Sequence, residues 1–145
     1  MKLSHLLQSK GSAVVTVRPE EQVRALVALL TEHRVGAVVV SPDGVEVAGI
    51  VSERDVINAL ARTGVEVMTE PVSAICTLAV HTAVPDTPVE QVMQTMTEAR
   101  VRHIPVLDAD GGLAGIVSIG DIVKNRIDAL AFERDALQSY VTSGG

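Results

Sequence analysis

The sequence predicts an α/β (α+β) fold in which two β-α-β-β-α units pack with pseudo-twofold symmetry, and three observations support this prediction. The chain matches itself at an offset of 66 residues: residues 16–57 align on 82–123 without a gap, and 14 of those 42 positions are identical. Unrelated segments would share about three positions at typical residue frequencies of roughly 7 %. Both copies alternate a helical pattern with short apolar runs. With 145 residues, 47 % of them apolar, the chain has the size of one domain or of two small units that share a core.

Each unit opens with a Thr, a loop that contains Pro19 or Pro85, and then an amphipathic run. In this run apolar residues recur at positions i, i+3, i+4 and i+7, which predicts a helix that ends near Arg34 in the first unit and near Arg100 in the second. The apolar residues are Val23, Leu26, Val27 and Leu30 in the first unit and Val89, Val92, Met93 and Met96 in the second.

Two short apolar runs around a glycine-containing turn follow this helix and predict a β-hairpin. The first runs are residues 37–40 and 104–106, and the second runs end in the repeated Ala-Gly-Ile-Val. A second helix is expected from Ser52 and from Ser118. We therefore place the first repeat at residues 1–66, and the second, with a C-terminal helical extension, at residues 67–145. The linker lies near residues 63–74.

A single unit of this kind has only two well-defined strands and cannot bury its own sheet. Two copies related by a pseudo-twofold axis can pack sheet against sheet and helix against helix. The repetition therefore predicts one globule with two equivalent clefts.

The motif Ser-x-x-Asp occurs in both units, as Ser52 to Asp55 and as Ser118 to Asp121. Its plain interpretation is a capping box at the start of a helix. The motif also follows an apolar strand directly, and open α/β sheets commonly bind ligands at the carboxyl ends of their strands. A helix N-terminus there offers N–H groups to a phosphate, and the Asp can accept hydrogen bonds from the two hydroxyls of a ribose. Capping and nucleotide binding can coexist.

The whole pattern resembles the cystathionine β-synthase-type (CBS) domain pair, also called a Bateman module. It consists of Thr-Val-x-Pro, a helix, Val-x-x-(x)-Pro-Val, Asp-x-x-Gly, and Gly-Ile-Val-Ser-x-x-Asp followed by Val or Ile. The resemblance covers nearly the whole chain. It implies a regulatory fold that binds adenosine-containing ligands such as AMP, ADP, ATP, NAD or S-adenosylmethionine between the repeats. Such modules usually form a flat, disc-shaped dimer.

The resemblance also assigns roles in the second cleft. Asp121 would hold the ribose, and Ser118 would touch the ribose or the phosphate. Ile116, Pro105 and Val106 would flank the adenine.

Arg102 and His103 stand where family members often place basic residues against phosphates. A solvated Arg and a surface His are the plain alternatives. Lys124 lies one turn after Asp121, where it can pair with that acid or reach a phosphate. The other residues expected at nucleotide sites are Thr16, Val17, Gly120, Ser52, Arg54 and Asp55.

The first repeat departs from this pattern. It has Gly36 and Ala37 where the second repeat has its basic pair, and Val39 where the second has its proline. Glu53 adds a negative charge beside Asp55. We therefore expect the first cleft to hold phosphate less well than the second, or to take a different ligand.

The C-terminal residues 121–140 continue as a helix beyond the repeat. Ile122, Val123, Ile127 and Leu130 give one apolar stripe, which either ordinary packing or a dimer contact explains. Two exposed helical faces in each module would leave a larger apolar patch than monomers usually tolerate. We therefore expect a homodimer, with Leu137 and Tyr140 as a second contact.

Charge and composition limit the other functions. A net charge of −6 without a Lys/Arg-rich run argues against nucleic-acid binding. The single Cys76 and four scattered His residues give no metal-ligand cluster, and no catalytic motif is evident, so we expect neither a metal nor an enzyme. No apolar run reaches the roughly 18–20 residues of a membrane span, and the N-terminus is too short and polar for a signal sequence. A cytoplasmic location is expected.

The leading functional prediction is a stand-alone sensor module, with no catalytic cofactor, that binds AMP, ADP, ATP or NAD as a regulatory ligand and acts on an unknown target protein. The alternative is a ligand-free structural or partner-binding CBS scaffold. A ribose-binding Asp does not distinguish among these nucleotides.

Overall fold

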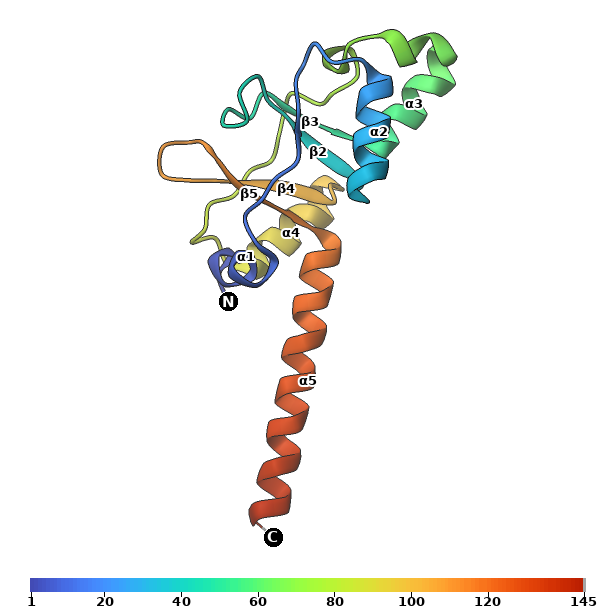
Figure 1. The fold of residues 1–145 in the computed structure, drawn as a ribbon. Helices are drawn as coiled ribbons and strands as arrows, with labels where there is room; N and C mark the ends of the chain where they lie inside the picture. The colour runs from blue at the N-terminus through green and yellow to red at the C-terminus, as the bar shows by residue number, and fades with distance from the viewer. Residues whose placement is uncertain (145) are drawn as a thin grey trace.

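Two β-hairpins form the centre of the molecule, and helices flank them (Figure 1). The structure is a computed structural model that describes residues 1–144, with side chains up to residue 142. The mixed helix and strand architecture with two repeats is confirmed. In chain order the elements are α1 (Leu3–Lys10), β1 (Thr16–Val17), α2 (Val23–His33), β2 (Ala37–Val40), β3 (Gly49–Ser52), α3 (Glu53–Thr63), the 3-10 helices η1 (Val65–Thr69) and η2 (Val72–Ala74), α4 (Val89–Ala99), β4 (His103–Leu107), β5 (Leu113–Ser118) and α5 (Ile119–Gly144).

The two sheets have equivalent hairpins. In the first sheet, β1 runs parallel to β2, and β3 is antiparallel to β2 with Ser52 opposite Ala37. In the second, β5 is antiparallel to β4 with Ser118 opposite His103. A single parallel bridge at Ala83 stands in place of β1. Both motif serines therefore lie at equivalent strand ends, directly before a helix.

The first helix of each repeat ends where the sequence predicts. Arg34 after α2 and Arg100 after α4 adopt the left-handed conformation, with φ of 53° and 55°, which terminates a helix. The apolar faces of both helices point inward, although Met93 is 39 % exposed. The buried residues are Val23, Leu26 and Leu30 in α2 and Val89, Val92 and Met96 in α4.

The two cores exchange the segments that precede them in the chain. The sequence did not predict α1, yet its Leu3 and Leu6 are buried in the core of the second repeat. The segment before the second repeat covers the first core in the same way, with Val67 and Val72 buried there. Packing therefore crosses the predicted boundary between residues 66 and 67, and that boundary stays a prediction about the sequence repeat.

Equivalent backbone hydrogen bonds hold the two exchanged segments. Val89 donates from its backbone N–H to the Met1 carbonyl, and Val23 donates to the Glu70 carbonyl, both at 2.9 Å. Positions 23 and 89 are related by the 66-residue repeat. Their acceptors at positions 1 and 70 are 69 residues apart, so the exchanged segments correspond with a spacing of their own.

The last helix, α5, projects far beyond the globule (Figure 1). Its first turns pack on α1 and α4, where Ile122 is buried. Val123, Ile127 and Leu130 are instead 49 %, 60 % and 49 % exposed. The predicted stripe was therefore wrong in one member: Ile122 faces the core, and the other three residues face solvent.

Replacement of Leu3 by Ala should lower the free energy of unfolding by about 2–5 kcal/mol, because a fully buried side chain is removed and a cavity is left. Urea unfolding followed by circular dichroism measures this change. Leu78→Ala is the matched control, since Leu78 is 74 % exposed and its loss should change the free energy by less than about 0.5 kcal/mol. Equal effects of the two substitutions would contradict the place of α1 in the second core.

Candidate functional site

Both Ser-x-x-Asp motifs form capping boxes. The Ser52 backbone N–H donates to Asp55 Oδ2 at 2.8 Å, and the Asp55 N–H donates to Ser52 Oγ at 3.3 Å. In the second repeat the Ser118 N–H donates to Asp121 Oδ2 at 2.8 Å, and the Asp121 N–H donates to Ser118 Oγ at 3.1 Å. The plain interpretation of the motif is therefore confirmed, and each Asp is held at the first turn of its helix.

Asp121 has a second partner that the sequence did not predict. The Lys10 ammonium donates to Asp121 Oδ2 at 2.5 Å and to the Ile116 carbonyl at 2.6 Å. The two charged side chains are only 29 % and 25 % exposed. Partial burial raises the pKa of Asp121, but hydrogen bonds from Lys10 and Ser118 outweigh burial and hold that pKa below its ordinary value.

The equivalent place in the first repeat is closed by backbone. The Ile50 carbonyl accepts from the Thr77 N–H at 2.8 Å, and Ile50 donates to the Thr77 carbonyl at 2.9 Å. Among the described residues, Asp55 forms no ion pair. The free edge of β3 is therefore paired with another segment of chain, whereas the edge of β5 at Ile116 is held by a single side chain.

The repeated glycine of Gly-Ile-Val lets these segments approach the strands. A Cβ atom added at Gly115 would lie 2.9 Å from Leu7 Cδ2 on α1, and one added at Gly49 would lie 2.9 Å from the Thr77 carbonyl oxygen. Both distances are too short for a real side chain. The glycine therefore fixes where α1, and with it Lys10, rests on the second repeat.

His103 lies between the two repeats. A Cβ added at Gly36 would be 3.5 Å from His103 Cε1 and 3.6 Å from Glu53 Oε1, so the imidazole and this carboxylate flank the same glycine. Burial lowers the pKa of His103, and the positive charge of Lys10 lowers it further, against the opposing effects of Asp121 and Glu53. The prediction that Glu53 affects only the first cleft is wrong, because its charge also acts on His103.

The strand register divides the residues expected around adenine. Pro105 and Ile116 lie opposite each other in the β4–β5 ribbon, so their side chains share a face. Val106 points to the other face and is fully buried in the core of the second repeat. The expected adenine contact of the Val106 side chain is therefore wrong, and Pro105 and Ile116 remain.

Several other expected residues are exposed near the motifs. Arg102 is exposed and accepts a backbone hydrogen bond from Ile119 at 2.8 Å. Gly120, Lys124 and Arg54 are also exposed. Asp121 pairs with Lys10 rather than with Lys124, which answers one question that the sequence left open.

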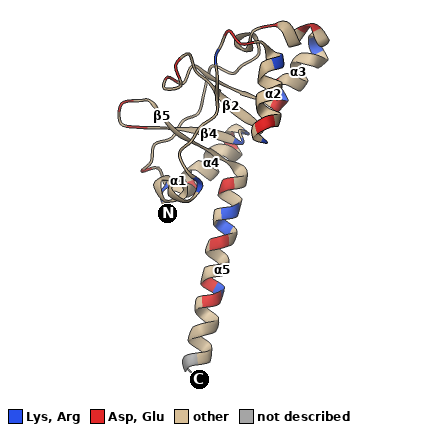
Figure 2. Cartoon of the chain, in the orientation of Figure 1, with Lys and Arg blue, Asp and Glu red and all other residues tan. Residues whose placement is uncertain are grey.

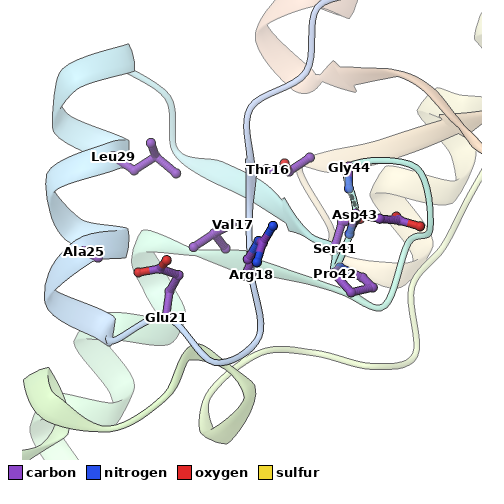
Figure 3. Close-up of a pocket in the computed structure, with 10 residues that line it drawn as sticks. All are labelled: Thr16, Val17, Arg18, Glu21, Ala25, Leu29, Ser41, Pro42, Asp43 and Gly44. Carbon is purple, nitrogen blue, oxygen red and sulfur yellow. Dashed lines mark hydrogen bonds between the residues drawn. The ribbon is translucent and has the colours of Figure 1, made fainter.

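Thr16 and Val17 line a different cavity, of about 420 Å³, on the first repeat (Figure 3). The cavity lies where β2 ends, beside the Ser41 turn, whereas Ser52 lies opposite the start of β2. The structure therefore does not bring Thr16 and Val17 together with Asp121. The remaining lining residues are Arg18, Glu21, Ala25, Leu29, Pro42, Asp43 and Gly44.

The residues around Asp121 suit a polar organic ligand. They combine a carboxylate, a backbone carbonyl and three basic side chains, Lys10, Arg102 and His103, at the start of α5. Within residues 1–144 no group of three or more His, Cys, Asp or Glu residues could hold a metal ion. Lys10 escaped the sequence analysis because α1 lies outside the repeat. The apolar spacing of Leu3, Leu6 and Leu7 was the signal for a short helix.

Comparisons with known proteins agree with this fold. The CBS domain family matches the chain twice, at residues 11–62 and 65–128. The mitochondrial CBS domain-containing protein CBSX3 of Arabidopsis thaliana is 34 % identical over 150 residues, which cover 98 % of this chain and 72 % of that protein. A solved CBS-domain protein of Agrobacterium tumefaciens is 42 % identical, with a TM-score of 0.83 over 87 % of this chain and 99 % of that one. A CBS domain protein of Pyrobaculum aerophilum, solved in complex with AMP, is 27 % identical, with a TM-score of 0.73 over 98 % of this chain and 99 % of that one.

Acidification should destabilise the protein through His103. Its folded pKa lies below the ordinary 6.5, so the unfolded state binds more protons, and the free energy of unfolding falls as the pH drops through 6.5 toward the folded pKa. Urea unfolding at pH values between about 7.5 and 5.5 measures this slope. His103→Gln should flatten it, while His5→Gln, which removes an exposed His, should leave it as in the wild type. The same slope in the wild type and His103→Gln would show that His103 does not titrate in this way.

Proposed function

Because this chain belongs to the CBS domain family, with two CBS domains in tandem, we propose that it is a regulatory module that binds an adenosine-containing nucleotide at Asp121. One observation carries this proposal. The Asp121 carboxylate is fixed at a helix N-terminus by its capping box, and basic side chains surround it. The Pyrobaculum aerophilum relative, which was solved with AMP, supports the adenosine class.

Each polar part of a nucleotide has a matching group in this cleft. Asp121 would accept hydrogen bonds from the ribose diol, as ionised carboxylates do well. The adenine would lie between Pro105 and Ile116, which share one face of the ribbon. Arg102 is exposed and would contact phosphate, as its guanidinium geometry favours.

The second cleft suits a nucleotide better than the first. Its acceptors at Asp121 and Ile116 are held by the Lys10 side chain, which can rotate away. The equivalent edge at Ile50 is paired with the Thr77 backbone, and a ligand could open it only by moving the chain. We therefore propose one principal site per chain, with AMP, ADP, ATP and NAD as the candidate ligands.

The rival function is a CBS scaffold that binds a partner protein with both clefts empty. CBS pairs are regulatory units, and we propose no catalysed reaction. No helix in residues 1–144 is both long and apolar enough to cross a membrane. The cytoplasmic location stays a prediction, because one relative is a mitochondrial protein.

Asp121→Ala should weaken AMP binding by about 1.5–3 kcal/mol, because it removes hydrogen bonds to a charged acceptor. Isothermal titration calorimetry measures the affinity. Asp55→Ala is the matched control, because it removes the same capping box from the other repeat and should leave the tighter class of sites intact. Loss of either cap costs about 0.5–2 kcal/mol of stability, so melting without ligand must accompany the titration. Unchanged affinity in a folded Asp121→Ala protein would favour the scaffold.

We also propose that the module is a homodimer in which α5 contributes to the contact. Its exposed apolar residues Val123, Ile127, Leu130, Leu137 and Val141 follow the alternating spacing of four and three residues typical of paired helices, with Arg134 at the position between Leu130 and Leu137. An isolated helix with such a face is only marginally stable in water. A second copy would cover this surface.

The charges of α5 favour an antiparallel pair. Acidic and basic residues are interspersed along the helix (Figure 2). If the twofold axis lies between residues 128 and 129, Ile127 faces Leu130 of the second copy, and Arg126 lies beside Glu133 of the second copy, twice per dimer. In a parallel pair Arg126 would instead lie beside Ala131, and no charges would match.

Reversal of one charge on α5 should weaken the dimer. Arg126→Glu and Glu133→Arg should each raise the dimer dissociation constant about 10-fold, since each creates two like-charge contacts. The double substitution should restore the wild-type value. Sedimentation equilibrium at low salt measures all four proteins. Wild-type protein with the mass of a single chain at micromolar concentration would contradict the dimer, and equal constants for all four would contradict the antiparallel arrangement.

A further inference from the structure

The Lys10 ammonium occupies the two acceptors that a nucleotide would need. From this we infer that Lys10 is a specificity-determining residue of the Asp121 cleft, which favours phosphorylated adenosine ligands over the nucleoside adenosine. This inference rests on the proposed function. It concerns a residue outside the CBS repeat motif, supplied by a helix that precedes both repeats.

The acceptor capacity of Asp121 forces a competition. Oδ2 already accepts from the Ser118 N–H at 2.8 Å and from Lys10 at 2.5 Å, and a carboxylate oxygen has two lone pairs. A ribose diol that binds both carboxylate oxygens therefore has to replace Lys10 on Oδ2. The capping bond from Ser118 remains, because it comes from the backbone at the start of α5.

The displaced ammonium cannot leave the cleft. Leu3 and Leu6 anchor α1 in the core of the second repeat, and Gly115 fixes its contact with β5. The flexible stem of a lysine allows its head to move while its backbone stays in place. Lys10 therefore ends up beside the bound ligand, on the same side as the other basic residues.

Adenosine and AMP then differ in what they return to Lys10. Both break the Lys10–Asp121 ion pair. Adenosine offers no new partner, whereas a phosphate gives the ammonium a charge-assisted hydrogen bond in a partly shielded place. Lys10 should therefore weaken the binding of adenosine and strengthen the binding of AMP.

The first repeat lacks this device. The exchanged segments correspond with the spacing of 69 residues that relates Met1 to Glu70, and this spacing places Ala79 where the second repeat has Lys10. Alanine can neither pair with Asp55 nor reach a phosphate. Discrimination by a lysine should therefore belong to the Asp121 cleft alone.

The test compares the affinities of the full chain for AMP and for adenosine, measured by calorimetry in the wild type, Lys10→Met and Lys10→Arg. In Lys10→Met the ratio of the two affinities should fall about 10-fold, with adenosine bound more tightly and AMP more weakly. Lys10→Arg keeps the charge and should keep most of the ratio. Lys2→Met is the matched control, since it removes one charge from the same segment at a side chain that is 57 % exposed and pairs with Asp86, and it should change nothing.

The outcomes separate this inference from the proposed function. An unchanged ratio in Lys10→Met, with both ligands still bound, would overturn the role of Lys10 and leave the nucleotide site standing. If neither ligand binds the wild type or Lys10→Met at millimolar concentration, the proposed function fails, and the role of Lys10 fails with it. Melting curves without ligand establish that each variant is folded, and the buried Leu3 and Leu6 should keep α1 docked in all of them.

Discussion

The burial of α1 in the core of the second repeat is the contact on which the rest of the molecule depends. A hairpin with one or two helices cannot enclose its own apolar face, and each repeat is completed by a segment from outside its sequence motif. Leu3 and Leu6 complete the second core, and Val67 and Val72 complete the first. Because each core uses a segment from the other half of the chain, the two repeats are expected to fold as one unit rather than as two independent domains.

The same exchange makes the two clefts chemically different although their backbones match. In the first repeat the exchanged segment pairs with the strand edge through the Thr77 backbone. In the second repeat the exchanged segment is helical and cannot form such a pair, so the Lys10 side chain satisfies the Ile116 carbonyl instead. One difference in local conformation thus replaces a fixed backbone contact by a movable charge. The differences in charge within the repeats themselves add to this effect.

The sequence predicted the repeated architecture because the hydrophobic spacing and the Gly-Ile-Val-Ser-x-x-Asp motif are local signals. Helix ends at Arg34 and Arg100 and the serine caps followed from those signals. The contacts of Lys10 and the proximity of His103 to Glu53 did not, because they join residues far apart in the chain. Val106 was misplaced for a different reason: a motif gives the order of residues, whereas the strand register decides which side chains point to the core. Ile122 was misplaced likewise, since only packing on α1 and α4 separates it from the exposed stripe.

Asp121 belongs to the cleft and to α5 at once, which limits how a ligand can act on the rest of the molecule. Its carboxylate caps the first turn of α5 through the Ser118 N–H, and that bond survives when ribose hydroxyls replace Lys10. The helix therefore has no reason to unwind or rotate on binding. The group that has to move is the Lys10 ammonium, at the end of α1. A ligand shifts a conformational equilibrium only by its difference in affinity between two states, and here the two states differ in the partner of Lys10. We therefore expect any ligand-dependent change to begin at the end of α1 and in the residues that connect it to β1, rather than along α5.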